Sequence, residues 1–175
     1  QPPLIWVLQG PRAGDNAQAR ALAAVRDGEV KLIALSDNWT AKIPNVFRSA
    51  SLAILQSHSA AQLLPPWPDF VIGVGRRAAP VLLEIKKRSK GYSKAICIGR
   101  PRMPLQAFDL VLTTPQYALP RKNNVVELPL PLHEKGGIDP KDRAHLLAQW
   151  AAFPRPWIVA VVGGPKYPFR LGNAE

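Results

Sequence analysis

The residues best placed to do chemistry follow the first apolar run of the sequence, Leu4–Leu8. A glycine turn begins there, and an alanine-rich stretch with a helical pattern follows from Asp15 to Arg26. Glycines let a ligand approach the backbone closely, and the N-terminus of a helix favours an anion. The candidate ligand-binding residues of this loop are Gly10, Arg12, Gly14, Asn16 and Gln18. The alternative is structural, with the glycines forming a turn and Asp15 capping the helix in a capping box with Gln18.

A second glycine loop, Gly73–Ala78, has the form of the dinucleotide fingerprint G-x-G-x-x-A. The match is weak, because the loop follows the third expected strand rather than the first. The next strand also ends in a basic residue, Arg100, where an acidic ribose ligand would be expected. We therefore expect no dinucleotide cofactor. Gly75, Arg76 and Arg77 still stand near a helix start, where they would contact a phosphate or a carboxylate unless they form a solvated surface.

Two more loops follow expected strands and carry polar residues. Arg100 and Arg102 follow the strand expected at Lys94–Ile98, and Gln116 follows the one expected at Leu110–Thr113. In open α/β sheets ligands bind beyond the carboxyl ends of the strands, so both loops are candidates to line one cleft.

A fourth loop follows the apolar run Trp157–Val162 and contains Gly163, Gly164 and Lys166. Glycines and a lysine after a strand can hold a diphosphate on backbone N–H groups. The spacing differs from that of a Walker A loop, so the sequence does not favour an ATPase.

Several other chemistries lack residues in this sequence. The three histidines have no metal-ligand spacing, so we expect no metal site, and there is no G-x-S-x-G elbow for a serine hydrolase. Cys97 is the only cysteine and stands in an apolar run, so no disulfide within the chain is possible and a cytosolic compartment is the default.

The charge is the most unusual bulk property of the chain. Lysine and arginine outnumber the acidic residues by 23 to 12, which gives a net charge of +11 and points to an anionic partner. The excess is concentrated between Arg76 and Lys122, where the only acids are Glu84 and Asp109. Aromatic residues do not alternate with the basic ones there, so we expect no nucleic-acid partner. No apolar run is long enough to span a membrane, and peripheral contact with an anionic membrane surface remains an alternative.

The elements that would position these loops alternate as strand, turn and helix. Besides the runs named above, strands are expected at Val30–Leu35, Phe70–Val74 and Val125–Leu128, and helices at Val46–Leu64 and Ala78–Arg88. Six strands then form one sheet. The fold class is α/β with a Rossmann-like parallel sheet in an N-terminal domain, residues 1–135.

Residues 136–175 are expected to begin a second Rossmann-like domain. Asp139 is typical of an N-cap with Pro140 at the first helical position, and the helix would extend to about Ala152. A strand from Trp157 to Val162 would follow. Its glycine turn has no helix after it, so we expect the chain to be cut off as the second domain begins.

The loops also resemble a known family. The segments Pro2–Gln18, Pro68–Arg77, Ile98–Arg102, Phe108–Tyr117 and Leu128–His133, with Val161–Pro165, are similar to the bacterial proteins labelled predicted nucleoside-diphosphate-sugar epimerases, relatives of the plant elongated-mitochondria fission protein. The resemblance implies a GT-B-like architecture, in which two Rossmann-like domains face a cleft. It also implies that Gly163, Gly164 and Lys166 contact the donor phosphates, while the loop from Gly10 to Gln18 faces the acceptor.

Two functions follow from this resemblance. The first is a nucleotide-sugar-utilising enzyme, a GT-B-type glycosyltransferase or an epimerase, with arginines stabilising the departing diphosphate and Asp15 as general base. The second is a non-catalytic adaptor on a membrane surface, as the plant relative is associated with recruiting a division dynamin. The expected location is cytoplasmic, with peripheral contact at the inner membrane face as an extension of the adaptor hypothesis.

Overall fold

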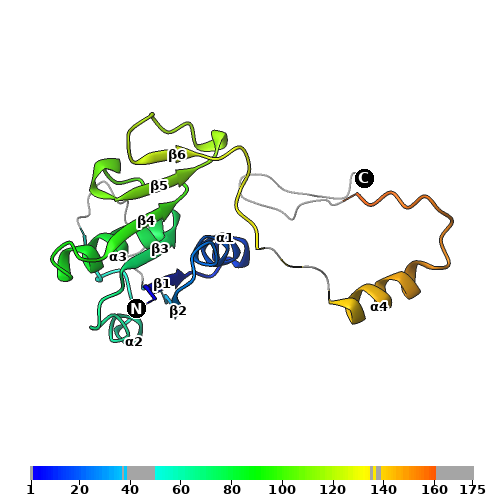
Figure 1. Cartoon of the computed structure of the whole chain (residues 1–175), viewed down its shortest axis with the longest axis horizontal. Helices are drawn as coiled ribbons and strands as arrows, with labels where there is room; N and C mark the ends of the chain where they lie inside the picture. Colours follow the sequence, from blue (N-terminus) through cyan, green and yellow to red (C-terminus); the bar gives the residue numbers. More distant parts are fainter. Residues whose placement is uncertain (1, 37, 39–49, 135, 137–138, 161–175) are drawn as a thin grey trace. The chain divides into compact units, whose positions relative to one another are not determined.

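The computed structural model describes residues 2–36, 38, 50–134, 136 and 139–160. They fall into two compact units, Gln1–Lys135 and Gly136–Glu175. The first unit contains a six-stranded, fully parallel sheet with helices on its faces (Figure 1). The expected α/β fold with a Rossmann-like parallel sheet is confirmed.

The elements follow the chain in alternation. The strands are β1 (Leu4–Gln9), β2 (Glu29–Ala34), β3 (Phe70–Val74), β4 (Lys94–Ile98), β5 (Leu110–Thr113) and β6 (Val125–Glu127). The helices are α1 (Ala13–Ala23), α2 (Ser57–Ala60), α3 (Gly75–Arg88) and α4 (Pro140–Trp150), with short 3₁₀ turns at Leu105–Ala107 and Pro115–Tyr117.

The order of the strands creates a switch point in the sheet. The order is β2-β1-β3-β4-β5-β6, so β1 pairs with β2 on one side and with β3 on the other. The connection after β1 therefore leads to one edge of the sheet, and the connection after β3 leads toward the other. Such a point is where open α/β sheets bind ligands, beyond the carboxyl ends of the strands.

Two apolar clusters, one on each face of the sheet, hold the helices in place. Successive residues of a strand point to opposite faces, so Trp6 belongs to one cluster and Val7 to the other. The cluster around Trp6 includes Leu82 and Ile85 of α3, both fully buried. The cluster around Val7 includes Ala19 of α1. The helices α1 and α3 therefore cover opposite faces, and both begin at the carboxyl edge of the sheet.

Gly73 explains how closely α3 approaches the sheet. A Cβ atom built on Gly73 would lie 2.6 Å from the Cβ atom of Ala78, much nearer than two carbon atoms pack. Gly75, where the strand ends and the helix begins, has φ +67°, a conformation that glycine adopts without strain. The two glycines thus fix the first turn of α3 against the end of β3.

The first helix begins earlier than the sequence suggested, and the expected capping box is wrong. Arg12 is the N-cap residue, with no side-chain cap, and the first helical N–H···O bond runs from Asn16 N to Arg12 O. Asp15 lies inside the first turn, where its negative charge still favours the helix dipole.

The helix expected from Val46 to Leu64 is also wrong in its described part, residues 50–64. Only Ser57–Ala60 is helical there. The preceding residues instead bond to the segment that follows β2: Gln56 N donates to Ser36 O, and the Asn38 amide donates to two carbonyl oxygens, those of Ala53 and Leu55. Carbonyl groups engaged in this way are not available to a helix.

The described part of the second unit contains α4. The expected cap is confirmed, because the Asp139 carboxylate accepts a hydrogen bond from Lys141 N at 2.8 Å. Of the strand expected from Trp157, the described residues 157–160 form no strand, and Val161 and Val162 lie outside the described residues. Across the described part of the chain, no helix is long and apolar enough to cross a membrane.

Candidate functional site

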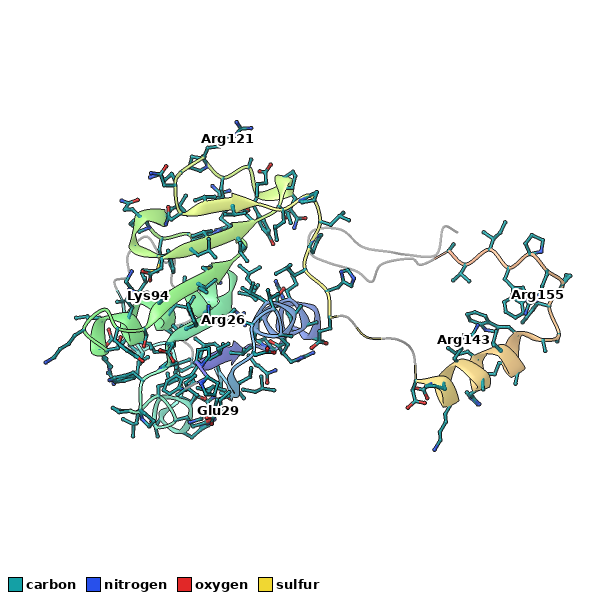
Figure 2. The ribbon with its side chains drawn as sticks, viewed as in Figure 1. Arg26, Glu29, Lys94, Arg121, Arg143 and Arg155 are labelled. Atoms are coloured by element: carbon teal, nitrogen blue, oxygen red, sulfur yellow. The ribbon has the colours of Figure 1, made fainter. Side chains whose placement is uncertain are left out.

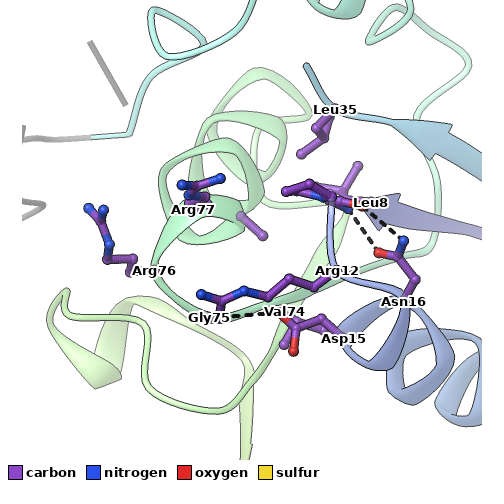
Figure 3. A pocket seen from close by; sticks show the side chains of 12 residues that line it. Leu8, Arg12, Asp15, Asn16, Leu35, Val74, Gly75, Arg76 and Arg77 are labelled. Atoms are coloured by element: carbon purple, nitrogen blue, oxygen red, sulfur yellow. Dashed lines mark hydrogen bonds and ion pairs between the residues drawn. The ribbon is translucent and has the colours of Figure 1, made fainter. Parts of the chain in front are cut away.

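A cavity of about 160 Å³ lies at the switch point, beyond the carboxyl ends of β1 and β3. We call it the switch-point cavity (Figure 3). It is lined by residues from the ends of β1, β2 and β3 and from the first turns of α1 and α3, namely Leu8, Gly10, Pro11, Arg12, Asp15, Asn16, Leu35, Val74, Gly75, Arg76, Arg77 and Ala78. The first and second glycine loops, about 60 residues apart in the sequence, therefore form one site.

The loop after β1 is fixed by a pair of reciprocal hydrogen bonds. Gly10 N donates to the Asn16 side-chain oxygen, and the Asn16 amide donates back to Gly10 O, both at 2.9 Å (Figure 3). Asn16 thereby ties the end of β1 to the first turn of α1. Its side chain holds the loop in place, and Asn16 also lines the switch-point cavity, so its expected ligand contact stays a prediction.

Three guanidinium groups make the switch-point cavity cationic. Arg12 comes from the N-cap of α1, while Arg76 and Arg77 come from the first turn of α3. Asp15 is the acidic residue lining the cavity, and its carboxylate lies 4.0 Å from the Arg12 guanidinium. The N-termini of two helices, which carry unsatisfied N–H groups and partial positive charge, begin at the same place. The arrangement suits an anion with several oxygen atoms, such as a phosphate.

A second, smaller cavity of about 30 Å³ lies beyond the carboxyl ends of β4 and β5. We call it the β5 cavity. Its polar lining comes from the uncharged residues Gln18, Thr113, Thr114, Gln116 and Tyr117. Its other lining residues are Val74, Ile98, Gly99, Leu112, Leu128, Pro131 and Leu132. The two loops expected to line one cleft do so here, through Gly99 and Gln116. Val74 lines both cavities, so they are neighbours.

The chain that follows β6 forms one wall of the β5 cavity, and an ion pair connects this segment to α1. Glu134 forms a bidentate ion pair with Arg20, and this contact lowers the pKa of Glu134 and raises that of Arg20. Leu128 and Leu132 pack on the apolar cluster of the same sheet face. Residues 128–134 are therefore held over the carboxyl ends of β4 and β5.

Some expected site residues lie elsewhere. Gly14 is exposed in the first turn of α1 and lines neither cavity, and Arg100 and Arg102 are exposed and line neither. The donor-phosphate residues Gly163, Gly164 and Lys166 lie outside the described residues. Thr114 belongs to the loop Thr113–Tyr117, which was expected as a whole to line the cleft. Sequence reasoning missed Leu35, because the second strand was expected to include it, whereas β2 ends at Ala34.

The basic residues between Arg76 and Lys122 do not form one patch. Helix α3 runs antiparallel to the strands, so Arg76 lies at the carboxyl edge of the sheet whereas Lys87 lies at the amino edge. Lys94, at the start of β4, is also at the amino edge (Figure 2). Others are paired with acids at 2.8 Å: Lys86 with Asp109 and Arg88 with Glu84.

The described residues offer neither a metal-binding cluster nor a reactive thiol. No group of three or more histidine, cysteine, aspartate or glutamate side chains there could hold a metal ion. Cys97 is fully buried in the sheet, and burial raises the pKa of its thiol to about 12, so it is a neutral packing residue at pH 7.

Comparison of the sequence with known proteins identifies the family of the chain. The family described as mitochondrial fission ELM1 matches residues 13–175, from the start of α1 onward. The chain belongs to the mitochondrial fission ELM1 family. An uncharacterized protein of Rickettsia prowazekii (strain Madrid E), RP120, is 34% identical over 113 residues, which cover 62% of this chain and 30% of the relative. The matched region thus spans less than a third of that family relative, and no solved structure matches the chain.

Proposed function

We propose that this chain is part of a nucleotide-sugar-utilising enzyme, a GT-B-type glycosyltransferase, and that its switch-point cavity binds a phosphate group of the reactants. The observation that carries the proposal is the convergence of Arg12, Arg76 and Arg77 with two helix N-termini on one cavity. A phosphorylated ligand matches this set in charge and in hydrogen-bonding geometry.

The proposed chemistry assigns a role to each charged group. The guanidinium groups and helix N-termini stabilise negative charge as the nucleoside diphosphate leaves the sugar. Asp15 lines the same cavity and has a side chain that is 37% exposed, so it is within reach of a ligand and serves as the general base for the acceptor hydroxyl. Gly163, Gly164 and Lys166 remain the proposed donor-phosphate contacts. An epimerase acting on nucleoside-diphosphate sugars would use the same anion site.

Calorimetric titration with inorganic phosphate, UDP and UDP-glucose tests the proposal. We expect binding of at least one of them, and R77Q should weaken it about tenfold or more, since a charge-assisted hydrogen bond contributes about 1.5 to 3 kcal/mol. The matched control is R121Q, which removes one positive charge from an exposed loop that lines neither cavity. Failure of the wild-type protein to bind any of these ligands, or equal losses in R77Q and R121Q, would contradict the proposal.

A second candidate is a non-catalytic adaptor on an anionic membrane surface. It is favoured by the family description, which refers to mitochondrial fission, and by the net charge of +11. The basic residues are divided between two edges of the sheet and so do not form one surface for a membrane, which favours the small-molecule site instead. Sedimentation with liposomes separates the two functions: an adaptor binds vesicles that contain anionic lipid, and its binding falls as salt is added.

A further inference from the structure

The hydroxyl group of Thr114 is buried without a hydrogen-bond partner. Thr114 is 9% exposed, and its Oγ1 atom is one of two buried side-chain polar atoms in the described residues for which no partner is present. Buried polar groups in proteins are almost always paired, because an unpaired one loses its hydration without compensation. An exception next to a cavity calls for a partner from outside the chain.

The other such atom, Nε1 of Trp6, provides a contrast. Trp6 is 1% exposed in the core and packs beside Trp67, and it lines neither cavity described above. Thr114 instead directly follows β5 and lines the β5 cavity. Of the two cavities described above, the β5 cavity is therefore the one that borders Thr114.

The lining of the β5 cavity defines the kind of group that it accepts. It carries no charged side chain, and its polar residues are amides and hydroxyls, which recognise neutral donors and acceptors. Its volume of about 30 Å³ suits one group of about the size of a water molecule or a hydroxyl. The switch-point cavity is larger and cationic, and Val74 lies in the walls of both. One ligand can therefore place an anionic group in the first cavity and a hydroxyl in the second.

We infer that the β5 cavity binds a hydroxyl group of the ligand whose phosphate occupies the switch-point cavity, with Thr114 as its hydrogen-bond partner. This inference rests on the proposed function and names the residue that recognises a hydroxyl group of the ligand. The ligand is a phosphorylated polyhydroxy compound, a class that includes sugar phosphates and nucleotide sugars. A lone phosphate fills the switch-point cavity and supplies no hydroxyl group to Thr114.

Two variants of Thr114 test the inference by calorimetry, with inorganic phosphate, glycerol 3-phosphate and glucose 1-phosphate as ligands. T114V keeps the shape of the side chain and removes the hydroxyl, whereas T114S keeps the hydroxyl. In the wild-type protein we expect at least one of the two organic phosphates to bind about tenfold more tightly than inorganic phosphate, as for one good hydrogen bond. T114V should abolish that advantage and leave the affinity for inorganic phosphate within about twofold, and T114S should retain it.

The outcomes distinguish this inference from the proposed function. If phosphate binds and R77Q weakens it, but T114V leaves the organic phosphates unaffected or weakens all three ligands equally, the inference fails and the anion site stands. If none of the three ligands binds the wild-type protein, the inference fails, and the proposed function fails with it only if UDP and UDP-glucose do not bind either. Urea unfolding of T114V verifies that the variant is folded, and a midpoint at or above that of the wild-type protein is expected because no hydrogen bond within the described residues is lost.

Discussion

The substitution Gly73→Ala tests how the fold sets the position of the site. The added methyl carbon would lie 2.6 Å from the Ala78 Cβ atom, about 1 Å closer than carbon atoms pack. Helix α3 must then move away from β3, and its first turn carries Arg76 and Arg77 into the switch-point cavity. Overpacking of a well-packed core costs about 1 to 3 kcal/mol of unfolding free energy.

A double-mutant cycle isolates this steric contact. A78G alone should cost about 2 kcal/mol, from about 1 for a glycine in a helix and about 0.8 for the lost buried methyl group. G73A combined with A78G relieves the overlap, so the pair should cost about 2 kcal/mol less than the sum of the two single variants. The assay is urea unfolding with linear extrapolation.

The same exchange at Gly14 serves as the control. Gly14 is exposed in the first turn of α1, and a Cβ atom built on it meets nothing within 4 Å. G14A should raise the unfolding free energy by about 0.5 kcal/mol, because alanine favours a helix. Additive effects in the cycle at positions 73 and 78 would refute the steric argument.

Three further predictions concern buried and hydrogen-bonded groups. Cys97 should resist alkylation by iodoacetamide at pH 8, where burial and a pKa of about 12 keep it a thiol, and should react once urea unfolds the chain; rapid labelling of the folded protein would contradict this. The hydroxyl of Tyr92 and the N–H of Leu4 donate hydrogen bonds to the Asp69 carboxylate and lower the pKa of Asp69 below the usual 3.8. The ionised Asp69 therefore stabilises the fold fully above about pH 4, and this stabilisation is lost as the pH falls through the lower pKa that Asp69 has in the folded protein. Urea midpoints measured from pH 7 to pH 2 should therefore fall less steeply for D69N, and equal slopes would be evidence against this role. T114V should raise the unfolding free energy by about 1 kcal/mol, because it removes an unpaired buried hydroxyl, and a loss of similar size would mean that this hydroxyl is paired in the folded protein.

Local patterns were enough to predict the strands of the sheet. The inner strands β1, β3, β4 and β5 are short, mainly apolar runs, and burial on both faces favours such runs in parallel sheets. The edge strands β2 and β6 are largely exposed, and their β-branched residues predicted them. The conformation of residues 50–64 was mispredicted because it depends on hydrogen bonds to Ser36 and Asn38. The partners of these two residues, Ala53, Leu55 and Gln56, lie 15 to 20 residues later in the sequence. A pattern within one window cannot contain such contacts.

The candidate site, too, could be predicted only in part from the sequence. The glycine loops at Gly10 and Gly75 were identified because ligands bind after strands, yet their union in one cavity depends on the pairing of β1 with β3. Arg100 follows a strand in the same way, but it is exposed and lines neither cavity. Position after a strand therefore identifies candidates, and the order of the strands decides which of them meet.

The most direct test of the anion site is the map of backbone amide shifts during titration of the ¹⁵N-labelled protein with inorganic phosphate. We expect the largest changes at Asp15 in the first turn of α1 and at Gly75 to Arg77 in the first turn of α3, because these residues line the switch-point cavity and the N–H groups of a helix's first turn favour an anion. Changes confined to the basic residues at the amino edge, such as Lys87 and Lys94, or no saturable change at all, would contradict the proposed phosphate site.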